Sequence, residues 1–213
     1  MSTPVPPSLL LRFPIRAGAH PRREDGLCAM EMVAWLAGEE HSDGPRCACP
    51  VLAAVVRALN DALPTDAERS RHLRPCIPRL VNSRLGTHAE RQRGQLVADY
   101  AVRVFAPMAL ESRGDATAAD RVRKLPAVLD RASALCAAGA LQSLGSSVAP
   151  AAWLAARAAG PLAPALWVGA VVRQAQAVRD PRAFDLLDLL VEQLLITDVA
   201  SEALPVQGLA ELG

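Results

Sequence analysis

The sequence predicts an all-α fold, a single-domain bundle of about seven to eight helices. Of its 213 residues 51% are hydrophobic but only 3% are aromatic, so the core must consist mainly of small and aliphatic side chains on closely packed helices. Apolar residues recur at helical spacing in several segments. No segment alternates apolar and polar residues with β-branched enrichment, and no Asn-Gly hairpin signal occurs, so strands are not expected.

Start and stop signals mark the first helices. A helix over 27–38 ends at a glycine, and Pro50 takes the favoured first position of a second helix over 50–63. Thr65 is an N-cap residue and begins a third helix. Pro75 and Pro78 end that helix, because proline removes a backbone donor and clashes with the preceding turn.

The remaining helices form one domain over residues 26–200. They are expected at 87–110 with a bend near Pro107, and at 116–142, 149–159, 162–178 and 183–198. Residues 1–25 hold four prolines before position 15 and a polar run from His20, which predicts a partly ordered N-terminal arm. Residues 201–213 are expected to form a short tail.

Composition excludes several classes of protein. A net charge of +1 gives no general attraction to nucleic acid or to anionic membranes. Between Ala132 and Val172 the only charged residue is Arg157, but this stretch is mostly Ala with Gly, Ser and three prolines, which favours buried helices over a membrane span. The absence of a signal-peptide pattern and the odd number of cysteines, five, predict a cytoplasmic protein without a disulfide framework.

An arginine-rich segment and an acidic helix face are expected to pair with each other. Residues 69–93 contain seven arginines and one acid but no interleaved aromatic residues, so intramolecular pairing or solvation is favoured over nucleic-acid binding. The acidic partners share one side of the last helix: Asp185, Asp188 and Glu192. His72 and His88, as single histidines near this segment, are interpreted as surface or capping residues.

The last helix also carries an apolar stripe at helical spacing: Phe184, Leu187, Val191, Leu194 and Leu195. We expect this stripe to close the core of the domain. A homodimer through this helix face is the alternative, because an exposed apolar stripe would need a partner.

Glu31 is the one polar side chain in the apolar helix 27–38. At 100° per residue it lies between Leu27 and Trp35, so no polar face carries it into solvent. A buried carboxylate needs an arginine, a metal ion or a proton as its partner. A structural ion pair with an arginine is therefore one interpretation, and a weak catalytic candidate, acting as general acid or base, is the other.

Three cysteines and a histidine lie near Glu31 in the sequence. Cys49 falls at the N-cap of helix 50–63, where the helix dipole favours a thiolate, and Cys47 precedes it by two residues. With Cys28 and His41 they make a set of three sulfurs and one imidazole, which suits zinc or another thiophilic metal. The spacing matches no zinc-finger pattern, so reactive thiols and inert buried cysteines stay open as alternatives. A thiol nucleophile at Cys28 is disfavoured by the absence of expected strands.

The segment DGLCAMEMVAWLAGEEHSDGPRCACPVL, within residues 25–63, resembles a group of small bacterial and phage all-α proteins with a Cys-rich N-terminal segment and no known activity. FDLLDLL near the C-terminus is similar to the last helix of that group. The sequence therefore predicts a cytosolic helical protein with a thiol-centred metal-binding or redox site. The alternative is a non-catalytic helical interaction or adaptor protein with inert cysteines, and the sequence does not decide whether the protein is an enzyme.

Overall fold

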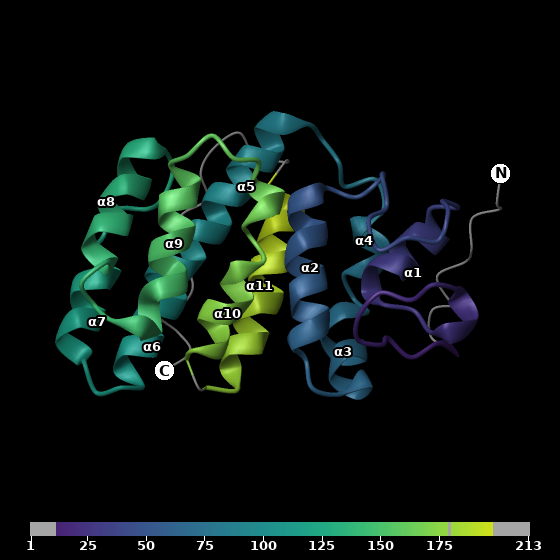
Figure 1. The fold of residues 1–213 in the computed structure, drawn as a ribbon, viewed down its shortest axis with the longest axis horizontal. Helices are drawn as coiled ribbons and strands as arrows, with labels where there is room; N and C mark the ends of the chain where they lie inside the picture. The colour runs from purple at the N-terminus through teal and green to yellow at the C-terminus, as the bar shows by residue number, and fades with distance from the viewer. Residues whose placement is uncertain (1–11, 179, 198–213) are drawn as a thin grey trace.

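A computed structural model describes residues 12–178 and 180–197, and these contain helices and no strands (Figure 1). The all-α prediction is confirmed, although the helices outnumber the seven to eight expected. Their bounds are α1 (Ala29–Leu36), α2 (Pro50–Ala62), α3 (Asp66–Leu73), α4 (Ile77–Leu80), α5 (Thr87–Tyr100), α6 (Ala106–Glu111), α7 (Ala116–Arg123), α8 (Arg131–Leu141), α9 (Ala149–Ala158), α10 (Ala170–Gln176) and α11 (Arg182–Ile196).

The helices pack around one hydrophobic core. Figure 1 shows α2, α10 and α11 in the middle of the molecule, with α1, α3 and α4 at one end and α7, α8 and α9 toward the other. The apolar stripe of α11 closes this core, as predicted: Leu187, Val191 and Leu194 are buried, and Phe184 and Leu195 pack against the buried residues. This stripe is therefore not exposed to a second chain, and the homodimer through a helix face stays a prediction.

The predicted helix 116–142 is wrong, because two helices, α7 and α8, occupy that range. Pro126 interrupts the helical hydrogen bonds between them. Asp130 then begins α8 as its N-cap. The Asp130 carboxylate accepts a hydrogen bond from the Ser133 N–H, and the Ser133 side chain accepts one from the Asp130 N–H. The sequence pattern does not show this boundary, because alanine, which favours helix, is frequent on both sides of it.

The expected helix 87–110 is confirmed, because the chain is helical without a break from Thr87 to Glu111. It contains a π-helical turn, Ala101–Phe105, between α5 and α6. A bend was expected near Pro107, because proline has no N–H to donate to the preceding turn. The π-helical turn ends just before Pro107. The expected helix 162–178 differs from the prediction: Pro164 begins a 3-10 turn, Pro164–Leu166, and α10 begins only at Ala170.

The described part of the N-terminal arm lies against α1 and α2. Ile15 is fully buried, and the Arg16 N–H donates to the Leu27 carbonyl oxygen at 2.9 Å. On α2, Asn60 donates to the Arg16 carbonyl oxygen at 2.9 Å, and Asp61 accepts the N–H of Gly18 at 2.9 Å. These contacts place the arm over the start of α1. Residues 1–11 of the arm and the predicted tail, 201–213, lie outside the described residues.

Among the helices that the structure describes, none combines the length and the apolar character that crossing a membrane requires.

Candidate metal centre

Glu31 is buried in the first turn of α1, with 1% of its side chain exposed. Cys28 is the N-cap of this helix. Its N–H donates to the Glu31 carboxylate at 2.7 Å, and its sulfur accepts the Glu31 N–H at 3.4 Å. These reciprocal bonds form a capping box, in which the two residues satisfy each other's free donors. The prediction that Glu31 is buried and partnered is confirmed.

The other partners of Glu31 are histidines, not an arginine. His20, from the arm, donates its backbone N–H to Oε1 at 2.5 Å, and its ring Nδ1 lies 2.9 Å from Oε2. The Nε2 atom of His41 lies 3.7 Å from Oε1 and 2.8 Å from the His20 carbonyl oxygen. Burial alone would raise the pKa of Glu31, but the hydrogen bonds from His20 and Cys28 outweigh burial and hold this pKa below its ordinary value.

We expect the fold to lose stability in acid because of Glu31. Its pKa is lower in the folded than in the unfolded chain, so the ionised carboxylate stabilises the fold above the ordinary value of 4.5. This contribution disappears as the pH falls through the lower, folded pKa. Thermal unfolding between pH 6 and pH 3 should therefore show a smaller loss of Tm for Glu31→Gln than for the wild type. Equal losses in the two proteins would contradict this role.

The four predicted metal ligands do not come together as a metal site in this structure. Cys28 and Cys49 are buried, Cys47 is half-buried, and His41 contacts Glu31. Cys49 is the N-cap of α2, as predicted, but its sulfur accepts no capping hydrogen bond, and its N–H donates to the Ser83 hydroxyl at 2.9 Å. Burial raises the pKa of Cys28 to about 12 and also raises the pKa of Cys47. These two thiols are therefore poorly suited to reaction at neutral pH.

Thiol labelling is expected to follow burial. At pH 8, iodoacetamide should modify the exposed Cys136 first, and Cys47 more slowly. Cys28, Cys49 and Cys76 should react only after unfolding, because all three are buried. Peptide mass spectrometry of native and urea-unfolded protein measures each site. Fast native labelling of Cys49 would instead support the predicted thiol site.

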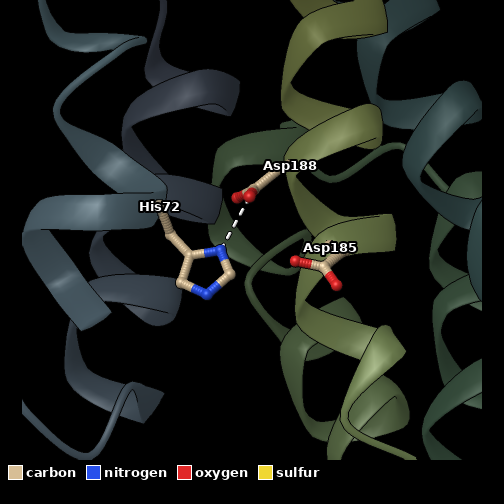
Figure 2. A group of neighbouring side chains, drawn as sticks. All are labelled: His72, Asp185 and Asp188. Atoms are coloured by element: carbon tan, nitrogen blue, oxygen red, sulfur yellow. Dashed lines mark hydrogen bonds and ion pairs between the residues drawn. The ribbon is translucent and has the colours of Figure 1, made fainter.

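A different group of side chains has the geometry of a metal site. One ligand atom from each of His72, Asp185 and Asp188 lies within 4.8 Å of the others. His72 comes from α3, whereas both aspartates come from α11, and the three side chains converge (Figure 2). His72 Nδ1 lies 2.7 Å from Asp188 Oδ2. Within residues 12–178 and 180–197, no other three His, Cys, Asp or Glu side chains meet this criterion.

The electrostatics of this group favour a cation. Burial, with a smaller effect of the neighbouring Asp185 charge, raises the pKa of Asp188 in spite of the opposing effect of His72. The Oδ1 atom of Asp188 is buried and accepts no hydrogen bond from the described part of the chain. The His72 side chain is 5% exposed, and a cavity of about 90 Å³ adjoins it and Asp188. A positive ion between the two aspartates would relieve both their repulsion and the unsatisfied oxygen.

Ion pairs surround the group and join the arginine-rich segment to α11. Arg71 Nη2 lies 3.0 Å from Asp185 Oδ1, and Arg79 pairs with Glu192. The predicted pairing between this segment and the acidic face of the last helix is thus confirmed. The interpretation of His72 as a surface or capping residue is wrong, since it is buried against α11. The acidic face was the only sequence signal that pointed to this place.

No model of a protein family matches the chain, and comparisons with curated proteins and with solved structures also find no match. The resemblance of residues 25–63 to small bacterial and phage proteins therefore stays a prediction. The case for a metal centre depends on the geometry of His72, Asp185 and Asp188.

Proposed function

We propose that the protein binds a divalent transition-metal ion, such as zinc, through His72, Asp185 and Asp188. One observation supports this proposal above the others: three ligand atoms of suitable chemistry lie within 4.8 Å of one another. Zinc binds histidine nitrogen and carboxylate oxygen at about 2.0–2.2 Å, so the ligand atoms of a tetrahedral site are about 3.4 Å apart. Modest side-chain rotations of the two aspartates would close the group around an ion.

Binding replaces weak interactions with stronger ones. The ion would displace Arg71 from Asp185, but both of these side chains are more than half exposed, and such pairs contribute about 0–1 kcal/mol. It would also compete with the hydrogen bond between His72 and Asp188. In return, the ion would neutralise both carboxylates, and the unsatisfied Oδ1 atom of Asp188 would gain a partner.

Three protein ligands leave a position for water. Structural zinc sites are usually closed by four protein ligands, whereas sites that activate water keep one position open. The group also connects α3 to α11, which are 116 residues apart at the His72–Asp188 contact. A bound ion would therefore stabilise the folded chain as well as present a water molecule to the adjoining cavity.

The test is a calorimetric titration of Zn²⁺ into the full-length chain, purified without a His tag and stripped of metal. We expect one equivalent to bind the wild type and to raise its Tm. Asp185→Asn should weaken binding by at least tenfold without unfolding the protein, because Asp185 is exposed. His72→Ala should abolish binding. His88→Ala changes an exposed histidine on α5 and should bind as the wild type does.

The same titration separates this site from the thiol-centred site that the sequence suggested. Cys49→Ser should keep the ion if His72 and the aspartates hold it, and should lose the ion if the cysteines do. A wild type that takes up less than a tenth of an equivalent would contradict both sites. The non-catalytic helical interaction protein would then be the better interpretation.

A further inference from the structure

A second pocket, which shares no lining residue with the proposed metal centre, opens on the face formed by α2, α9 and α10. Its volume is about 260 Å³. α10 packs against both of the other helices, and Figure 1 shows it between them. Trp153 of α9 and Leu166 of the 3-10 turn form apolar walls, and Arg57 of α2 and Arg173 of α10 supply the charges.

The pocket carries positive charge without a neutralising acid. No Asp or Glu occurs among the described residues that line it. Arg173 is exposed and forms no hydrogen bond or ion pair with the described residues, and Arg57 donates a single bond, to the Asp43 carbonyl oxygen at 2.8 Å. Several arginines elsewhere in the described part of the chain are instead paired with carboxylates, as Arg103 is with Asp99 at 2.6 Å. The two pocket arginines thus retain donors for a ligand.

Apolar surface is exposed directly beside these charges. Leu166 is 73% exposed and Trp153 is 38% exposed. A third arginine, Arg157, lies over the Trp153 ring, 5.1 Å from its centre. The backbone at Gly169, which also lines the pocket, lies close to α2: a Cβ added there would be 3.3 Å from the Ala54 carbonyl oxygen. An aromatic side chain, Trp153, and the guanidinium groups of Arg57 and Arg173 therefore line the same pocket.

We propose that this pocket binds a small organic anion, an aromatic or similarly flat apolar group that carries a carboxylate or a phosphate. The apolar group would lie against Trp153 and Leu166, and the anion would accept hydrogen bonds from Arg57 and Arg173, whose planar guanidinium groups match both kinds of anion. The volume is slightly below the range of about 300–1,000 Å³ typical of drug-sized ligands, which limits the ligand to a small one. This site is independent of the proposed metal centre.

The test uses saturation-transfer NMR and calorimetry on the full chain with three probes: 1-naphthyl phosphate, 1-naphthoate and neutral 1-naphthol. We expect one or both anions to bind at least ten times more tightly than 1-naphthol, and the stronger of the two identifies the preferred anion. Inorganic phosphate alone should bind more weakly than 1-naphthyl phosphate, because it lacks the apolar contact.

Two variants examine the two halves of the pocket. Arg173→Gln and Trp153→Ala should each weaken binding of the preferred anion at least tenfold, while circular dichroism confirms that both remain folded. Arg131→Gln removes an exposed arginine of α8 outside the pocket and should bind like the wild type. Three results would overturn the proposal: no binding of either anion at millimolar concentration, equal binding of 1-naphthol, or unchanged affinity in Arg173→Gln.

Discussion

Replacing Glu31 by glutamine is expected to destabilise the fold by about 2–4 kcal/mol. In the wild type the carboxylate accepts bonds from two backbone N–H groups, those of His20 and Cys28, and contacts the His20 ring. Glutamine has one acceptor oxygen and an NH₂ group, which is itself a donor and would here face another donor. At least one buried donor would lose its partner, and the hydrogen bonds between His20 of the arm and α1 would be weakened.

Urea unfolding followed by circular dichroism measures the free energy of unfolding, and limited trypsin digestion reports on the arm. Cleavage after Arg16 and Arg22, both in the arm, should become faster in Glu31→Gln. Glu24→Gln is the matched control, because Glu24 lies in the same arm but is exposed, and its effect should stay within about 0.5 kcal/mol. A Glu31→Gln protein as stable as this control would show that Glu31 does not anchor the arm.

The helices that the sequence predicts best are those with local signals at their ends. α2 begins at Pro50 as expected, and Thr65 caps α3 by accepting the Glu68 N–H at 3.2 Å. The prediction is wrong where alanine is uniform, as in the range divided at Pro126. There the apolar pattern continues through the break, because helix propensity and core packing both favour alanine. A proline inside such a pattern is the stronger signal.

In the candidate sites, too, the sequence predicts the features that depend on neighbouring residues and misses those that depend on distant ones. The burial of Glu31 follows from the apolar residues of its own helix, and the sequence predicts it. The partner of Glu31, His20, is 11 residues away, and the partner of His72, Asp188, is 116 residues away. Such contacts depend on how the helices pack, and this packing cannot be inferred from the pattern of a single sequence. Pairing of opposite charges predicted that the arginine-rich segment meets α11, but not which side chains would converge there.

Replacing Arg93 by methionine is expected to destabilise the protein by about 2–4 kcal/mol. Arg93, on α5, is 1% exposed. Its Nε donates to the Leu194 carbonyl oxygen at 2.9 Å, and its Nη1 donates to the Ser83 carbonyl oxygen at 2.9 Å. Leu194 lies in the last turn of α11, where carbonyl groups lack helical partners and the helix dipole is negative. Methionine fills similar space but donates to neither oxygen, so both buried carbonyls would lose this donor.

Urea unfolding of three variants separates the possible origins of this loss. Arg91→Met alters an exposed arginine of the same helix and should change the free energy of unfolding by no more than about 0.5 kcal/mol. Arg93→Lys keeps the charge but has no planar fork that reaches both carbonyl oxygens. If Arg93→Lys is nearly as unstable as Arg93→Met, the two directed hydrogen bonds are what Arg93 contributes. If Arg93→Lys is instead as stable as the wild type, the positive charge near the end of α11 is sufficient, and the proposed role of the two bonds is wrong.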